Sequence, residues 1–218
     1  GLLLESEPRT NLIQHSDLSS GWSETRADIS TVSTVTAPDG TSNVTAITSD
    51  LTAANSHKVA GIVGNPLTST GTFTFSSFVK DNGTDVQLEV TVDPASTVQL
   101  RKLNVLFDLQ AGTAATPYTT GSPNVIDYGI ENVGGGWYRC HVTTDNPDGT
   151  RVDVAMTLSQ YAFSNQNPAF NGDGTSGVYV YGAQFEVGEA IPNTNPVEYK
   201  DAPTPSSYIP TSGSTVIR

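Results

Sequence analysis

The sequence predicts an all-β protein whose strands form two antiparallel sheets packed face to face. No window of about 11 residues carries the apolar stripe of an amphipathic helix, and Thr, Val, Ser and Gly dominate the interior of the chain. Short segments with alternating apolar and polar residues recur instead, as one buried and one solvated face require. Turn residues separate these segments, and many short strands between turn signals favour a two-sheet sandwich.

The clearest strand is predicted over residues 85–92, where Val86, Leu88 and Val90 alternate with polar residues. The other predicted strands are, in chain order, 29–36, 43–48, 58–63, 72–80, 103–109, 137–144, 151–158 and 177–187. We expect about nine or ten strands in all, which suits a two-sheet architecture.

Four acidic turns punctuate the chain: Pro38-Asp39-Gly40-Thr41, Asp81-Asn82-Gly83-Thr84, Pro147-Asp148-Gly149-Thr150 and Asn171-Gly172-Asp173-Gly174-Thr175. Asp-Gly and Asn-Gly supply the positive φ that tight hairpins need, so we interpret the turns as hairpin connections. Their irregular spacing argues against internal repeats. A calcium site in these turns is the less favoured interpretation, because calcium takes about six to eight oxygens, which would have to converge from several loops.

The chain of 218 residues is long enough for one β domain with a core that needs no staples. We expect the sandwich to occupy residues 1–187. Five prolines follow Gly188, so residues 188–218 are predicted to form an extended tail without regular elements, lying over the sandwich or leading away from it. Because the sequence begins at Gly1 and ends at Arg218, we expect a module of a longer polypeptide.

The charge balance argues against nucleic acid as a partner. The formal net charge is −12 and the estimated pI is about 4.4, which repels polyphosphates and disfavours strongly anionic glycans unless cations bridge the contact. The favoured alternative is that the charge serves solubility alone. No apolar stretch approaches the roughly 20 residues of a membrane span, so no membrane insertion is expected. The single cysteine, Cys140, cannot form an internal disulfide, and we interpret it as a small buried hydrophobic residue.

A candidate binding face lies on the strand predicted at 137–144. Alternation places Trp137, Arg139 and His141 on one face. The opposite, apolar face carries Tyr138, Cys140 and Val142. An indole offers a flat platform for the C–H face of a sugar, and Arg and His donate to hydroxyls or carboxylates. The alternative is that Trp137 is a core residue on which Arg139 stacks, both serving structure.

Three further aromatic residues have predicted roles, two in the candidate binding face and one in the core. Tyr179 and Tyr181 share one face of a later strand, and Gln184 and Glu186 are predicted on the opposite face. Either pair extends the ligand surface if the two strands are neighbours. Trp22 follows Gly21 in a turn and is interpreted as a plug at the edge of the core.

The sequence gives little support for catalysis. The three histidines are widely spaced, without a zinc-binding spacing, and no Gly-x-Ser-x-Gly elbow occurs. Cys140 alternates into an apolar face, where a thiolate is disfavoured. Glu89 and Asp153 can meet across a sheet as a glycosidase pair, but an acidic β protein offers such pairs by chance. We therefore expect no enzyme activity.

Several short motifs occur in one order along the chain. They are Leu2-Leu3-Leu4-Glu5, Arg9-Thr10-Asn11-Leu12-Ile13, Ser19 to Trp22, Pro38-Asp39-Gly40-Thr41, Phe78-Val79-Lys80, Ile130 to Cys140, Gly172 to Glu186 and Ser207 to Gly213. This series resembles a domain found in bacteriophage tail-fibre and other virion structural proteins, which is similar to carbohydrate-binding modules.

The resemblance implies a jelly-roll sandwich that binds glycans without catalysis, at the virion surface or outside the cell, where it would contact a cell-surface polysaccharide. Two alternatives remain: a structural or decorative virion domain, assembling as a homotrimer or with other virion proteins, and an accessory module of a polysaccharide-degrading enzyme. No cofactor is required. The resemblance also implies a structural calcium, carried loosely onto Glu5 and Glu186.

Overall fold

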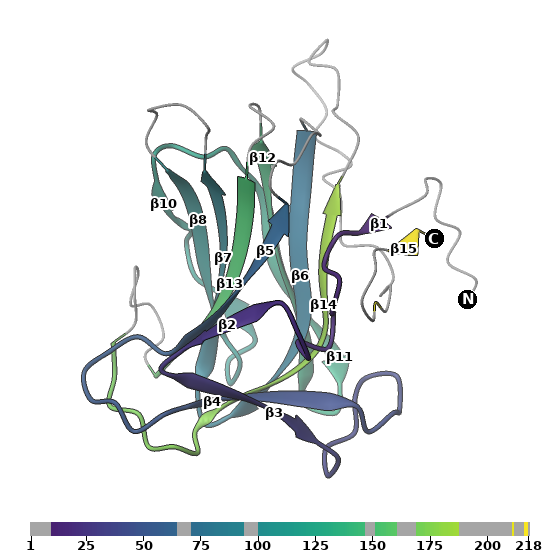
Figure 1. Cartoon of the computed structure of the whole chain (residues 1–218), viewed down its shortest axis with the longest axis vertical. Coiled ribbons are helices and arrows are strands. Elements are labelled where there is room, and N and C mark those ends of the chain that lie inside the picture. The colour runs from purple at the N-terminus through teal and green to yellow at the C-terminus, as the bar shows by residue number, and fades with distance from the viewer. Residues whose placement is uncertain are drawn as a thin grey trace.

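The chain folds as a two-sheet antiparallel β-sandwich of the jelly-roll type (Figure 1). The computed structural model describes residues 10–64, 71–93, 100–146, 151–160, 169–187, 211 and 216–217. Across these ranges the regular elements are all strands, and none is a helix able to cross a membrane. The predicted fold class is therefore confirmed.

One sheet has eight strands among the described residues. Its order is β11 (Val125–Gly134), β12 (Trp137–Asn146), β6 (Gly71–Asn82), β14 (Gly177–Val187), β1 (Thr10–Asn11) and β15 (Val216–Ile217). In addition β4 (Val44–Ser49) pairs with β14, and β3 (Ala27–Val32) pairs with β4. Strands β12 and β14 both flank β6, so the two strands that carry the predicted binding residues belong to one continuous surface.

The other sheet has seven strands in the described part of the chain. Its order is β10 (Tyr118–Thr120), β8 (Arg101–Asp108), β7 (Asp85–Asp93), β13 (Arg151–Ser159), β5 (Lys58–Gly64) and β2 (Trp22–Thr25). The short β9 (Thr113–Ala114) pairs with β8. All pairings in both sheets are antiparallel.

The core lies between the sheets and is built by the alternation seen in the sequence. Val86, Leu88 and Val90 of β7 are buried and face a core to which β6 and β14 contribute Phe73 and Phe185. These two rings stack with centroids 5.5 Å apart. Burying a side chain of this size stabilises the fold by about 2 to 3 kcal/mol, so the alternating strands are held together mainly by this layer.

Two of the predicted hairpins are wrong. The turn at 38–41 joins the paired strands β3 and β4, but the turn at 81–84 leads from β6 to β7, which lie in different sheets. The turn at 171–175 likewise leads into β14 from the sheet that contains β13. In both, an Asp accepts backbone N–H groups of its own turn, Gly83 N for Asp81 and Thr175 N for Asp173. Such a turn reverses the chain locally whether or not the next strand stays in the sheet.

The predicted separation of Gln184 and Glu186 from the two tyrosines of β14 is also wrong. The register pairs Tyr181 with Phe78 and Gln184 with Ser76, which are two residues apart on β6 and share one face. A β-bulge between Tyr181 and Gln184, where Gly182 has φ 66°, inserts the extra residue. Because a bulge shifts the alternation by one position, Gln184 and Glu186 return to the face of Tyr179.

The predicted plug at the edge of the core is confirmed. Trp22 is partly buried and packs against the core, and its Nε1 donates to the carbonyl oxygen of His15 at 3.3 Å. Its ring covers Gly61, where an added Cβ would lie 3.3 Å from ring atoms. A side chain at position 61 would therefore push the indole away from the core.

The end of the chain returns to the sandwich. Residues 188–210 and the turn at 147–150 lie outside the described residues, but Thr211 is buried and its Oγ1 donates to the carbonyl oxygen of Ile13 at 2.6 Å. The two-residue strand β15 pairs with β1, a regular element that the prediction of an extended tail did not include. The boundary at residue 187 stays a prediction.

Candidate functional site

The predicted binding residues lie together on the outer face of the eight-stranded sheet. Arg139, Phe78 and Tyr181 form one row across β12, β6 and β14. The neighbouring rows are Trp137 with Lys80 and Tyr179, and His141 with Ser76 and Gln184. We call the side chains of Phe78, Arg139, His141, Tyr179 and Tyr181 the Arg139–Tyr181 surface; all five are partly exposed.

Trp137 lies beneath this surface. Its side chain is 2% exposed, and it packs with Ala37 and Val44, against which Tyr179 and Tyr181 also pack. The indole Nε1 donates to the carbonyl oxygen of Thr36 at 2.9 Å, so the β3–β4 loop covers the ring. Of the two interpretations of Trp137, the structure has the packed one, with the loop between β3 and β4 as its cover. The aromatic ring under the Arg139 guanidinium is Phe78, whereas the prediction named Trp137.

Two aromatic rings and a guanidinium form the centre of the surface. The Arg139 guanidinium carbon lies 5.2 Å from the centroid of the Phe78 ring, within the range of a cation–π contact. The Phe78 and Tyr181 rings are 6.2 Å apart and tilted by 48°, an arrangement that aromatic pairs favour. These contacts hold the rings and the guanidinium in defined directions while part of each side chain stays exposed.

A carboxylate from the β3–β4 loop orients Tyr181. The Tyr181 hydroxyl donates to Oδ2 of Asp39 at 2.6 Å, and Thr41 N donates to Oδ1 of the same carboxylate at 2.9 Å. Burial acts to raise the pKa of Asp39, but these hydrogen bonds outweigh it and lower the pKa below its usual value. The carboxylate therefore stays ionised, and the loop that covers Trp137 is anchored on the surface residue Tyr181.

A second carboxylate orients His141. Its Nε2 lies 3.0 Å from Oδ2 of Asp127 on β11, the edge strand next to β12. The ring lies over Gly129, where an added Cβ would come within 2.7 Å of Cε1. Only glycine at that position leaves room for the ring, and the carboxylate fixes the ring's direction, so His141 is a positioned polar group.

The implied calcium site is only partly within the described residues. Glu5 lies outside them, and Glu186 is buried at the register position opposite Asn11. The carboxamide oxygen of Asn11 accepts from the backbone N–H of Ile13 and of Phe185, which leaves it a poor calcium ligand. In the part of the chain that the structure describes, no group of three or more His, Cys, Asp or Glu could hold a metal ion. The pair Glu5 and Glu186 stays a prediction.

The residues considered for catalysis are held in ways that do not suit it. Burial raises the pKa of the Cys140 thiol, so a nucleophilic thiolate is disfavoured. Glu89 and Asp153 do lie on neighbouring strands and one face, with Asp153 opposite Thr91. Both carboxylates already have cationic partners, since Glu89 forms an ion pair with Lys102 and Asp153 with Arg151.

Sequence reasoning missed three contributors to the surface. Phe78 lies on the face of β6 opposite the core residues. An aromatic residue at such a position could have been recognised in the sequence. Asp39 and Asp127 gave no such signal, because a loop and an edge strand bring them to Tyr181 and His141.

Fold and surface define the class: a two-sheet jelly-roll β-sandwich with a partly exposed aromatic and basic surface on one sheet. No protein-family profile and no curated protein matches the chain. Among solved structures it is similar to the CBM22-1 and GH10 modules of a Clostridium thermocellum xylanase complexed with xylohexaose, at 14% identity and TM-score 0.48. The match covers 83% of this chain and 28% of that chain.

Two further structures are similar over most of their length. The module TmCBM61, complexed with beta-1,4-galactotriose, has 10% identity, a TM-score of 0.40, and coverage of 80% of this chain and 95% of that chain. A putative sugar binding protein from Bacteroides thetaiotaomicron has 10% identity, a TM-score of 0.42, and coverage of 81% and 92%. What these proteins bind is a property of those proteins.

Proposed function

We propose that the chain is a non-catalytic glycan-binding module whose ligand lies on the Arg139–Tyr181 surface. One observation carries the proposal: partly exposed aromatic rings of β6 and β14 lie beside a guanidinium and an imidazole of β12 that are both held in place by neighbouring groups. A sugar offers C–H faces to such rings and hydroxyls to such donors, so the two kinds of group suit one ligand.

Each residue has a separate role in this proposal. The rings of Phe78, Tyr179 and Tyr181 provide the apolar contact. Arg139 and His141 donate to hydroxyl or carboxylate oxygens of the glycan. Trp137 supports the rings from below instead of contacting the ligand. Because the strands of the sheet carry these groups, little conformational entropy is lost when the ligand binds.

We propose that a phage fibre or a similar surface protein carries the module, which places it at the virion surface or outside the cell. The ordered series of sequence motifs supports this context. An accessory module of a polysaccharide-degrading enzyme is the other carrier of a glycan-binding domain. The sequence of the parent polypeptide distinguishes the two, since a neighbouring catalytic domain indicates the enzyme and a virion-attachment segment indicates the fibre.

Affinity electrophoresis of the purified chain in gels that contain bacterial and plant polysaccharides tests the binding. We expect retardation by at least one polysaccharide, and loss of it in Arg139→Gln and Tyr179→Ala. The matched control is Tyr118→Phe on β10, an edge strand of the other sheet. The proposal is wrong if no polysaccharide retards the chain, or if folded surface variants and the control migrate alike.

One observation favours the structural alternative, a virion domain that assembles with its own copies. The edge strand β11 exposes Val125, Tyr128 and Val133, and an uncovered edge can pair with another strand. Mass measurement in solution decides between the two. A trimer that dissociates when Val133 is replaced by Lys supports assembly through β11, and a monomer at high concentration excludes it.

A further inference from the structure

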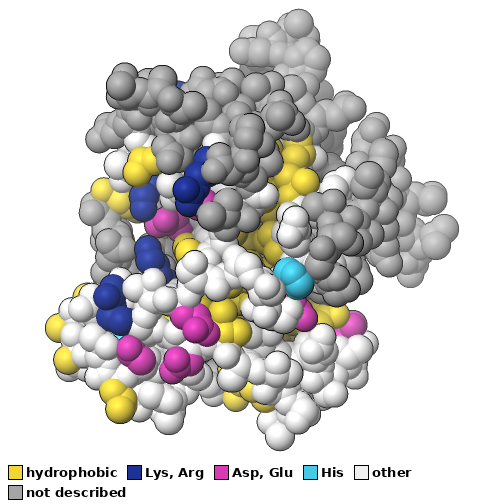
Figure 2. Space-filling view, viewed as in Figure 1, with side chains coloured by type: hydrophobic (Ala, Val, Ile, Leu, Met, Phe, Trp, Pro, Cys, Tyr) yellow, Lys and Arg dark blue, Asp and Glu magenta, His cyan; other side chains and the backbone are white. Residues whose placement is uncertain are grey.

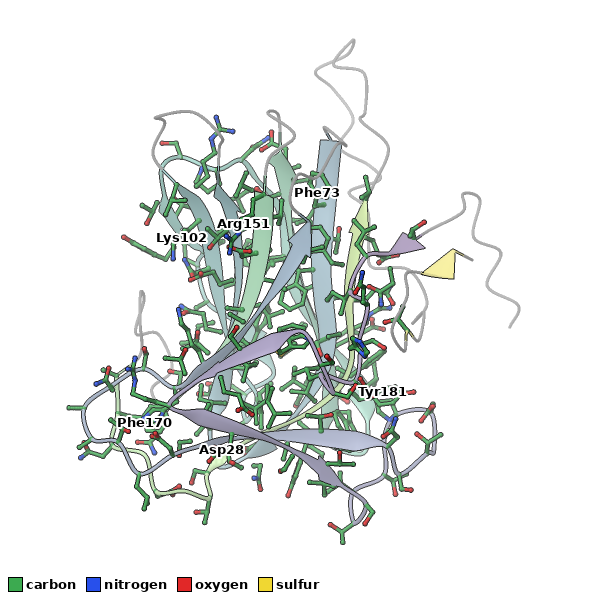
Figure 3. All side chains as sticks on the ribbon, viewed as in Figure 1. Asp28, Phe73, Lys102, Arg151, Phe170 and Tyr181 are labelled. Atoms are coloured by element: carbon green, nitrogen blue, oxygen red, sulfur yellow. The ribbon has the colours of Figure 1, made fainter. Side chains whose placement is uncertain are left out.

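A groove crosses the outer face of the seven-stranded sheet, away from the Arg139–Tyr181 surface. It has a volume of about 370 Å³. Its charged lining consists of Lys58, Glu89, Lys102, Arg151 and Asp153, and we call it the charged groove. Figure 3 shows Lys102 and Arg151 close together over the strands of this sheet, with Tyr181 on the other side of the molecule as drawn.

The charged groove reverses the charge balance of the chain. Three of the ten Lys and Arg line it, against two of the 22 Asp and Glu. Three cations and two carboxylates leave one positive charge in the groove of a chain whose net charge is −12. Figure 2 shows dark-blue side chains gathered on the same part of the molecule. Basic residues are scarce in this protein, so their concentration here points to a negatively charged ligand.

Two ion pairs hold the charged ends in place. Lys102 Nζ lies 3.2 Å from Oε1 of Glu89, and Arg151 Nε donates to both carboxylate oxygens of Asp153 at 2.9 and 3.0 Å. The four side chains are between 14% and 39% exposed. Pairs with this exposure contribute at most about 1 kcal/mol each, so a ligand carboxylate can share their cations at small cost.

Lys58 supplies the uncompensated charge. It lies on β5, opposite Thr157 of β13, and lines the same groove. Within the described ranges no carboxylate forms an ion pair with its ammonium group. An anionic group that enters the groove therefore meets a cation without having to break an existing pair.

The carboxylates of the groove decide which anion fits. Glu89 accepts from Thr91 Oγ1 at 2.8 Å and, like Asp153, presents oxygens that accept further hydrogen bonds from hydroxyl donors. A sulfate or phosphate ion brings no such donors and would be repelled by both carboxylates. A sugar acid brings hydroxyl donors and one carboxylate together. Leu100, Ala60 and Ala155 add apolar lining for its C–H groups.

We propose that the charged groove binds a uronic acid unit of an acidic polysaccharide, with Lys58 on the sugar carboxylate and Glu89 and Asp153 on its hydroxyls. This site is separate from the Arg139–Tyr181 surface and does not depend on it. A single acidic unit in a largely neutral chain fits best, because the net negative charge of the protein repels a ligand that carries many charges.

Isothermal titration with short oligosaccharides tests the proposal. The probes are di- and trisaccharides with a single galacturonate, glucuronate or mannuronate unit among neutral sugars, each beside its methyl ester, which keeps the sugar and removes the charge. We expect binding of at least one acid, loss of binding in its ester, and weakening of the acid in 1 M salt, which screens exposed charges. Absence of binding by all three acids, or equal binding of acid and ester, overturns the proposal.

Variants assign the binding to the groove. Lys58→Gln should lower the affinity for the acidic oligosaccharide by about tenfold, which corresponds to the loss of one charge-assisted hydrogen bond. Glu89→Gln should tighten it, because it removes a like charge and leaves the acceptor oxygen in place. Lys80→Gln, on the other sheet, removes the same charge as Lys58→Gln and should have little effect. If Glu89→Gln lowers the affinity, the groove is built for neutral sugars. If Lys80→Gln lowers the affinity as much as Lys58→Gln does, the acid is attracted to the whole protein. Either result contradicts the proposed site.

The outcomes for the two sites are independent. Tyr179→Ala should leave uronate binding intact, and Lys58→Gln should leave retardation by neutral polysaccharide intact. If uronate binding is lost in Tyr179→Ala and kept in Lys58→Gln, the acidic ligand occupies the surface and the groove proposal is wrong. Thermal unfolding of each variant shows that the compared proteins are folded.

Discussion

The hydroxyl of Tyr181 donates a 2.6 Å hydrogen bond to Asp39, which ties β14 to the loop between β3 and β4. The same loop carries Thr36, whose carbonyl oxygen accepts from the indole of Trp137. Two strand residues of the candidate site are thus fixed by one loop, and the position of that loop sets the shape of the surface.

Tyr181→Phe removes this tether and keeps the ring. We expect a loss of at most about 1 kcal/mol in the free energy of unfolding at neutral pH and a modest loss of glycan affinity. The pKa of Asp39 is lowered in the folded state. The stabilisation that its ionised form provides is therefore fully present above the ordinary pKa of an aspartate, and it is lost as the pH falls through the pKa of the folded state. Urea unfolding of both proteins at pH 7 and in acid measures this. Curves that fail to converge in acid contradict the role of the carboxylate.

Trp137→Phe tests whether Trp137 supports the surface rings from below or contacts the glycan directly. The change removes the hydrogen bond to Thr36 and part of a buried ring, so we expect destabilisation by about 2 kcal/mol. Glycan affinity of the folded variant should change little, because the ring does not reach the ligand. A large loss of affinity with unchanged stability would show that the indole contacts sugar. Gly61→Ala is the control, since it disturbs the other tryptophan, Trp22.

Alternation along single strands was sufficient to predict much of the fold. The segment 85–92 has one apolar face and forms most of β7, and 137–144 forms the first eight residues of β12, with Cys140 and Val142 in the core. Burial of one face is a local consequence of the pattern, so it can be read from the sequence. The edge strand β11 was missed because its side chains are mostly half-exposed or exposed and carry a weaker pattern.

The cover of Trp137 could not be predicted in the same way. The residue that accepts its indole hydrogen bond is 101 positions earlier in the chain, on a loop with no periodic signal. The bulge at Gly182 is a second case, since one inserted residue moves Gln184 to the other face without changing the composition of the strand. Both features depend on contacts between distant segments.

Gly129→Ala tests whether the direction of His141 matters. The new Cβ would lie 2.7 Å from Cε1 of the ring, so the imidazole must move away from Asp127. We expect about a fivefold loss of glycan affinity with a smaller effect on stability. The affinity of Gly129→Ala combined with His141→Ala should equal that of His141→Ala alone. Additive losses would mean that Gly129 acts through another group.

Cys140 should resist thiol reagents in the folded protein. Its side chain is buried and burial raises its pKa, so neither access nor thiolate is available. We expect an aromatic disulfide reagent to release its chromophore only when denaturant is added, with one equivalent per chain. Rapid reaction without denaturant would mean that β12 opens locally under native conditions.

Asp85, at the start of β7, gives the fold a pH dependence of defined sign. Burial raises its pKa from 3.8 to about 6, against the lowering effect of the N–H of Leu109 and with smaller increases from Asp108 and Asp81. Between these pH values the folded state binds more protons than the unfolded state, so the free energy of unfolding falls as the pH rises from about 4 to 6.

Asp85→Asn removes the buried charge and keeps an acceptor for Leu109 N, which lies 3.0 Å from Oδ1. Because the group is only half-buried, we expect the variant to gain about 1 kcal/mol at pH 7 and nothing at pH 4. Urea unfolding at the two pH values measures the difference. Asp28→Asn, an exposed change on β3, should give no gain at either pH. An equal gain for Asp85→Asn at both pH values would show that packing, and not the carboxylate charge, limits stability at this corner between the sheets.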